Sequence, residues 1–211
     1  MIPWPRLALA ALAALASPLA PHAGASGVPA GDAWLTSGEV RYLARDALAS
    51  WSGVAPASAI LLAFDPRDPG ALRLETRVEP AAFDSGNRLR DGRARATVFD
   101  TDDYPEARLV AAAAADETLP PLAPGDTITL PLDAELTLHG VTLAYRLEVR
   151  LSAEEDAEGH ARYRAEAEFE VSLTAHGMRR PTLLGLVTDD LVTVSLVATA
   201  RPDPTPSSTT R

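Results

Sequence analysis

The chain has 211 residues, a formal net charge of −10, 46% hydrophobic residues and no cysteine. Its length indicates a single domain, and the acidic balance argues against a nucleic-acid binder, which needs a basic face to neutralise phosphates. Without cysteine, disulfides, thiol nucleophiles and thiolate metal ligands are excluded.

The first 25 residues have the pattern of an export signal. Arg6 precedes an apolar run over Leu7–Ala16, and Ala23-Gly24-Ala25 is a small-x-small cleavage site. The run is too short to span a bilayer. We therefore expect a signal peptide over 1–25, a mature protein in the periplasm or secreted, and no transmembrane anchor after cleavage. An uncleaved membrane anchor is the alternative.

After this segment, period-two alternation dominates the chain. It predicts eight or nine strands, over Trp34–Leu43, Ala47–Trp51, Ala57–Phe64, Leu72–Glu79, Ala107–Ala113, Ile128–Leu138, Val141–Leu151, Tyr163–Leu173 and Leu191–Ala198. In the longer segments one face is apolar and the other is charged or polar, which is the pattern of half-buried antiparallel strands.

The stretch from Phe83 to Glu106 interrupts the strands and is the most densely charged part of the chain. Over Asn87–Phe99 it predicts one or two short helical turns, capped by Asp84 or Ser85. Its four arginines alternate with five aspartates; these residues are Arg88, Arg90, Arg93, Arg95, Asp84, Asp91, Asp100, Asp102 and Asp103.

Two interpretations of these charges are open. In the favoured one the arginines pair with the aspartates, because exposed clusters of mixed sign usually neutralise themselves. Arg90 and Asp91 would then form a buried salt bridge that braces the segment across one end of the fold. In the other interpretation the arginines contact the phosphate or carbonyl head of a ligand.

The dipeptide His139-Gly140 lies between two segments with matching alternation. A two-residue connection requires positive φ, which glycine adopts freely and histidine tolerates better than most residues. We therefore interpret His139 as a turn residue and not as a catalytic or metal-binding one. His22, His160 and His176 show no metal-ligand spacing, and the acidic tip around His160 is interpreted as a solvated charge run. No metal is expected.

Many antiparallel strands with few helices predict an all-β domain over 26–200, either a barrel or a sandwich. Ala165 and Ala167 on an apolar strand face favour a barrel, because small inward residues leave volume and about eight strands enclose room for one small ligand. The prediction is an antiparallel eight-stranded β-barrel with one or two short helices. Residues 201–211 are rich in Pro, Ser and Thr and are predicted to be a disordered tail.

Four segments, in this order and at these spacings, resemble the YceI-like family: "FDPRDP", "FDSGNRLRD", "DTDDYPEARL" and "LTLHGVT". Tyr104-Pro105 matches a Tyr-Pro of the family, and Arg93 replaces a histidine found in many members. Ala144-Tyr145 stands where Pro-Val often follows the His-Gly-Val-Thr. The residues that match the family's structural motifs are Asp84, Gly86, Asn87, Arg90, Asp91, His139, Gly140, Val141 and Thr142.

The resemblance implies a lipocalin-like barrel that binds an isoprenoid-type lipid, polyprenyl or quinone-like. Such a chain offers apolar area and few hydrogen-bond partners, so its site should be an apolar cavity with a few polar groups at the mouth. The candidate ligand-binding residues are those of the inward strand faces, Ile128, Leu130, Leu132, Leu143, Tyr145, Leu147, Tyr163, Ala165, Ala167 and Phe169.

Catalysis is not expected. No Gly-x-Ser-x-Gly, His-Glu-x-x-His or phosphate-binding loop occurs, and Asp84 and Asp91 fit capping and arginine pairing better than acid–base work. No catalytic residue and no cofactor is therefore predicted. The alternatives to a lipid-binding protein are a structural or interaction module of the periplasm, including a possible homodimer, and a hydrolase.

Overall fold

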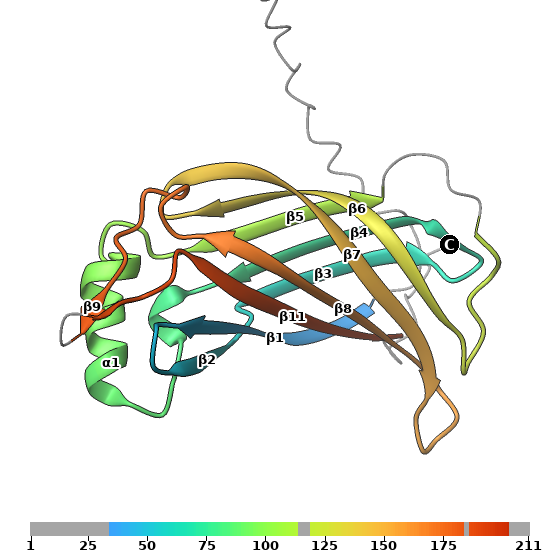
Figure 1. Ribbon diagram of the computed structural model, residues 1–211. Helices are drawn as coiled ribbons and strands as arrows, with labels where there is room; N and C mark the ends of the chain where they lie inside the picture. The colour runs from blue at the N-terminus through green and yellow to red at the C-terminus, as the bar shows by residue number, and fades with distance from the viewer. Residues whose placement is uncertain (1–33, 114–118, 184–185, 203–211) are drawn as a thin grey trace, which may run out of the picture.

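The computed structural model describes residues 34–113, 119–183 and 186–202. Nine strands form one antiparallel sheet in the order β2-β1-β11-β8-β7-β6-β5-β4-β3, which curls into a half-barrel (Figure 1). The strands are β1 Trp34–Arg45, β2 Ser50–Pro56, β3 Ala59–Asp65, β4 Asp68–Val78, β5 Ala107–Ala113, β6 Thr127–Leu138, β7 Val141–Glu155, β8 Ala161–Ser172 and β11 Leu191–Pro202. A separate hairpin pairs β9 Thr182–Leu183 with β10 Leu186–Val187.

The predicted all-β antiparallel architecture is confirmed, but the sheet has nine strands where eight were predicted. β2 and β3, although adjacent in sequence, lie at opposite edges of the sheet and do not pair with each other. β3 approaches β1 instead, where the Thr36 hydroxyl donates to the Ile60 carbonyl over 2.6 Å. Gly38 permits this approach, because a Cβ there would lie 2.4 Å from Ile60 Cδ1.

Helical turns occur where the charged stretch predicted them. η1 (Pro80–Ala82) is a short 3₁₀ turn, α1 (Arg88–Arg93) is α-helical, and η2 (Ala94–Phe99) continues it with π-helical bonding. The predicted cap was wrong by a few residues: Asn87 Oδ1 accepts from the amides of Leu89 and Arg90, both at 3.1 Å. Asp84 instead closes the preceding turn by accepting from the Gly86 amide.

The alternation predicted for the long strands is confirmed by burial. A cluster of buried side chains fills the half of the half-barrel remote from α1, with Phe64 and Tyr163 meeting edge-on at 5.0 Å between ring centroids. Its largest fully buried members away from the helical segment are Leu62, Leu72, Leu74, Leu130, Leu132, Leu147, Val149 and Leu151. We call this cluster the filled half.

The last strand, β11, extends four residues beyond the predicted end at Ala198. β11 continues to Pro202 and pairs with β1 up to Trp34, so the first two residues of the predicted tail are strand. The remaining tail residues and the predicted signal peptide lie outside the described residues. None of the described helices is long and apolar enough to cross a membrane.

Candidate functional site: a cavity beneath the helical cap

A cavity of about 320 Å³ lies between the helical segment 80–99, here called the cap, and one end of the sheet. Its wall is mainly apolar. The sheet contributes Val40, Tyr42, Ala44, Trp51, Val78, Leu109, Leu136, Leu138, Phe169, Val171, Val192, Val194 and Leu196. The cap contributes Pro80, Phe83, Leu89, Ala94, Val98 and Phe99. This volume lies at the lower end of the range for small-ligand sites.

The cap is held in place by its backbone and by three aromatic rings. Asp84 and Val54 of β2 exchange two backbone hydrogen bonds of 3.0 Å. Phe83 stacks on Phe99 at 5.7 Å, and both rings meet the edge of Tyr42 on β1. Because large rings support the cap at one side, the helical turns span the end of the sheet and leave the space beneath them empty.

Ser85 organises the polar part of the cap. Its hydroxyl donates to the buried Asp91 carboxylate at 2.5 Å and accepts from Arg90 Nε at 3.0 Å. Arg90 also lies over the Trp51 ring, 5.6 Å from its centroid. The predicted salt bridge between Arg90 and Asp91 is therefore wrong; within the described chain the two side chains are joined through Ser85.

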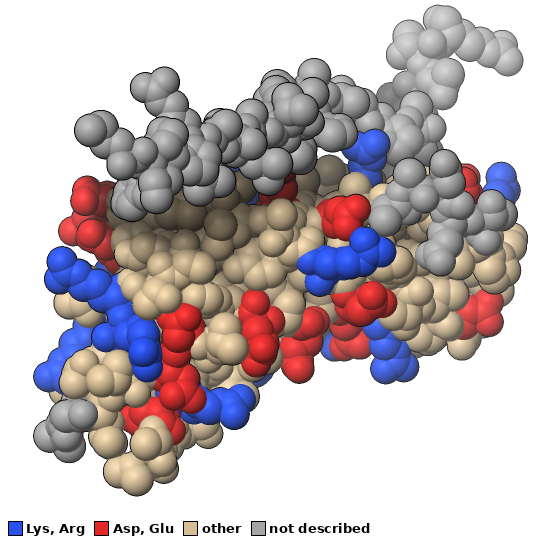
Figure 2. Space-filling model, turned by 45° about the horizontal axis from the view of Figure 1, so that its top comes forward, with Lys and Arg blue, Asp and Glu red and all other residues tan. Residues whose placement is uncertain are grey.

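The self-neutralised interpretation of the arginine cluster is wrong as well. The ion pairs found among residues 34–113, 119–183 and 186–202 all involve other side chains. Acidic and basic groups nevertheless gather at the end that carries α1, drawn at the left (Figure 2). Arg90 and Arg93 line the cavity with Asn87, and the exposed Leu89 lies between them. This edge of the cap is the polar mouth of the cavity.

The turn at His139-Gly140 has the predicted conformation. His139 and Gly140 have φ of 51° and 74° and connect β6 directly to β7. The Tyr104 ring packs on His139 with centroids 4.1 Å apart, and a Cβ on Gly140 would come within 2.8 Å of that ring. Tyr104, which follows the cap, therefore packs on this turn. Position 140 favours glycine because its φ is positive and because a Cβ would collide with the Tyr104 ring.

His176 was missed by sequence reasoning and is the most completely buried polar residue at this end. Nε2 lies 2.9 Å from the Tyr145 hydroxyl and Nδ1 lies 3.1 Å from the Val141 carbonyl. Burial lowers the pKa of His176 and raises that of Tyr145. The neutral ring therefore donates through Nδ1 and accepts from Tyr145 at Nε2. It fixes the loop that brings Leu173 and Met178 to the cavity wall.

Tyr42 and Thr76 are polar groups within the cavity wall. Burial, and secondarily the nearby Asp91 carboxylate, raises the pKa of Tyr42, so its phenol is neutral. Thr76 on β4 is 3% exposed, and its hydroxyl has no hydrogen-bond partner among the described residues. Alternation along β4 places Thr76 on the inward face with Leu74 and Val78, but nothing in the sequence shows that its hydroxyl is unpaired.

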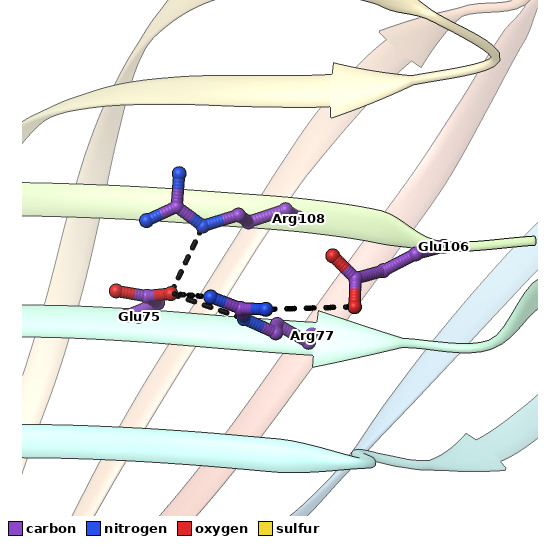
Figure 3. A network of polar contacts seen from close by, with 4 residues as sticks. All are labelled: Glu75, Arg77, Glu106 and Arg108. Carbon is purple, nitrogen blue, oxygen red and sulfur yellow. Dashed lines mark hydrogen bonds and ion pairs between the residues drawn. The ribbon is translucent and has the colours of Figure 1, made fainter.

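A charged network lies on the outer face next to this wall (Figure 3). Glu75 accepts from Arg108 at 2.9 Å and from Arg77 at 3.1 Å, and Arg77 also pairs with Glu106 at 3.7 Å. The hydrogen bond from Arg108 lowers the pKa of Glu75. Arg108 lines the cavity, but its guanidinium is turned to Glu75.

The ten predicted ligand-binding residues are distributed unevenly. Phe169 lines the cavity. Tyr145 packs on Phe169 and His176 behind the wall, and Leu143 is half-buried. The other seven belong to the filled half or pack against it: Ile128, Leu130, Leu132, Leu147, Tyr163, Ala165 and Ala167. Ligand contact at these ten residues stays a prediction. The cavity beneath the cap is lined by a different set of residues, with Phe169 the one member in common.

A group of three possible metal ligands, Asp156, Glu158 and His160, occurs at the exposed tip between β7 and β8. Asp156 Oδ1 already accepts from the backbone amides of Glu158 and His160, and these bonds lower the pKa of Asp156. The cluster is explained by the closure of its own hairpin.

Comparison with known proteins agrees with this architecture. The sequence model of the YceI-like domain family matches residues 39–200 of this chain. The chain belongs to the YceI-like family. No curated protein matches the sequence.

Among solved structures, the chain is similar to a polyisoprenoid binding domain from Saccharophagus degradans implicated in plant cell wall breakdown. The TM-score is 0.61 at 14% identity, over 82% of this chain and 100% of that one. BcnA from Burkholderia cenocepacia gives 0.59 at 15%, over 77% and 95%. A YceI protein from Campylobacter jejuni gives 0.55 at 14%, over 69% and 81%. At these identities the structures show the shared fold.

Proposed function

We propose that this member of the YceI-like family is an exported protein that sequesters or carries an amphiphilic lipid of isoprenoid type in the cavity beneath the cap, without catalysis. The observation that carries the proposal is an apolar cavity of about 320 Å³ with polar groups mainly at its mouth. The polyisoprenoid-binding relative supports the ligand class. The export pattern over 1–25 supports a periplasmic or secreted location.

The energetics suit an apolar chain. Burial of each methylene contributes about 0.8 kcal/mol, so a few isoprene units against this wall give useful affinity. Arg90, Arg93 and Asn87 at the mouth then select or orient the polar head. Arg93 occupies the position where many members of the family have histidine, so the head contacts here differ from theirs.

Native mass spectrometry of the protein purified from the cell that exports it tests the proposal. A discrete prenyl lipid that co-purifies, with an intact mass that begins at Ser26, is the expected result. Val171→Trp, which projects into the cavity, should be recovered empty. An empty wild-type protein that hydrolyses a chromogenic ester would instead support the hydrolase alternative.

A structural or interaction module that forms a homodimer is a second candidate. Five of the six exposed large apolar residues of the described chain line the cavity or lie within two residues in sequence of one that does: Leu43, Leu48, Leu89, Val187 and Leu191. Exposed apolar groups gathered at one end mark interaction surfaces. Light scattering after size exclusion should show a dimer that Leu48→Ser with Leu191→Ser converts to a monomer; a monomeric wild type would rule this candidate out.

A further inference from the structure

The Thr76 hydroxyl is the starting point of a more specific statement about the ligand. Of the buried side-chain nitrogen and oxygen atoms in the described ranges, it is the one that has no hydrogen-bond partner. Its strand neighbours across β3 and β5 are Ile60 and Leu109, and the adjacent residues on its own face are Leu74 and Val78. The hydroxyl is thus surrounded by apolar side chains, and Thr76 lines the cavity.

An unpaired buried hydroxyl is costly. Leaving such a group without a partner costs about 1–3 kcal/mol, and valine would fill the same volume at this position without that cost. Thr76 therefore lowers the stability of the unliganded fold. The oxygen itself has almost no accessible surface, so a group that enters the cavity reaches it once the Thr76 side chain rotates about χ1, with the strands in place.

We infer that Thr76 hydrogen-bonds an uncharged oxygen of the bound lipid, such as an alcohol or a carbonyl. This inference rests on the proposed function, because it specifies the ligand of the same cavity. One hydroxyl offers a single donor and does not offset the burial of a charge.

The side chains next to Thr76, which are Ile60, Leu74, Val78 and Leu109, offer no cation for a charged head. The arginines of the mouth belong to the cap, and the guanidinium of Arg108 is occupied by Glu75. An oxygen that reaches Thr76 is therefore neutral, and an anionic head would remain at the mouth with Arg90 and Arg93.

Three probes with the same hydrocarbon chain separate these cases: farnesol, farnesene and farnesyl diphosphate. Binding is followed by the fluorescence of Trp51, which lines the cavity. Wild-type protein should bind farnesol about threefold to tenfold more tightly than farnesene, the ratio that corresponds to one net hydrogen bond. Thr76→Val should lower farnesol affinity to the farnesene level and leave farnesene and farnesyl diphosphate unchanged.

Stability supplies a second readout. Unliganded Thr76→Val should melt at the wild-type temperature or above, whereas a hydroxyl with a structural partner would give a lower melting temperature. Thr129→Val, an exposed position on β6, is the matched control and should change neither readout.

The outcomes distinguish this inference from the proposed function. If wild-type protein binds none of the three probes, the proposed function fails, and the inference fails with it. Binding of farnesyl diphosphate alone would leave the proposed function standing and overturn the inference. If it binds both equally, or if Thr76→Val binds farnesol as wild type does, the inference alone is overturned. Loss of farnesyl diphosphate affinity in Thr76→Val, or a lower melting temperature, also overturns it.

Discussion

The two halves of the half-barrel are built from the same strands but differ in what occupies their interior. In the filled half, leucines from β4, β6 and β7 pack with the rings of Phe64 and Tyr163 into one buried cluster. In the half beneath the cap, inward residues of β6, β8 and β11 face a cavity. The difference shows that a hollow interior here depends on what covers the end of the sheet, and not on small residues along its strands.

Truncation of one leucine in each half along β6 should give the largest difference in stability between the two halves. Leu132 is fully buried in the filled half, so Leu132→Ala should lower the free energy of unfolding by about 2–5 kcal/mol. Leu138 lines the cavity, and Leu138→Ala should cost about 1–2 kcal/mol, because it already lacks neighbours on one side. Urea denaturation measures both. Equal losses would contradict the division into halves.

Enlargement of one residue in each half along β8 is the complementary change. Ala167 is packed between Val149 and Leu196 in the sheet and is 6% exposed. Ala167→Trp should therefore overpack the interior and cost about 1–3 kcal/mol. Val171→Trp projects into the cavity and should cost less while it blocks farnesol uptake. A folded Ala167→Trp that excludes farnesol with no loss of stability would move the binding space into the filled half.

His176, at the cavity end, should make the free energy of unfolding sensitive to mild acid. Its pKa in the folded protein lies below the ordinary 6.5, so the unfolded chain binds the proton more readily. The stabilisation is complete above pH 6.5 and decreases as pH falls below that value toward the folded pKa. Thermal melting from pH 8 to pH 5 measures this. His176→Phe should remove the slope and cost about 1–3 kcal/mol through the lost bonds to Tyr145 and Val141; an unchanged slope would assign it to another group.

The smallest effect is expected on the outer face, where the network of Figure 3 is solvated. Glu75→Gln should cost under about 1 kcal/mol at neutral pH, because exposed ion pairs contribute little. The pKa of Glu75 is lowered below 4.5, so its contribution is present above pH 4.5 and is lost as pH falls below it. Urea denaturation at pH 7 and pH 3 should show a difference between wild type and variant at pH 7 alone.

Much of the fold could be predicted from the sequence, because alternation on β4, β6, β7 and β8 directly reports which side chains face inward. The location of the cavity could not. Ala165 and Ala167 are small, but side chains from neighbouring strands fill the space beside them. The cavity instead depends on contacts among three rings that are distant in sequence, Tyr42, Phe83 and Phe99, which hold the cap over the end of the sheet.

The partners of the charged residues were equally hidden. Arg90 and Asp91 are adjacent in sequence, and their direct pairing was the simplest expectation. Asn87 caps α1, however, which leaves Ser85 free to stand between the two side chains. The unpaired hydroxyl of Thr76 could not be predicted from the sequence. It results from the apolar side chains of its neighbours on β3, β4 and β5, which offer no hydrogen-bond partner.

The contact between β1 and β3, here called the seam, affects how far the half-barrel can widen. Where those strands meet, the contact rests on the glycine at position 38, the Ile60 side chain and one hydroxyl bond from Thr36. The pairs that are neighbours in the sheet order are joined by antiparallel ladders, with one irregularity in the β3–β4 ladder between Ala63 and Asp65. Only Ala57 and Ser58 connect β2 to β3, and their amides donate to the Gly38 and Arg77 carbonyls. The chain itself therefore ties β1 to β3 at this seam, which limits how far the half-barrel can widen around a bulkier tail.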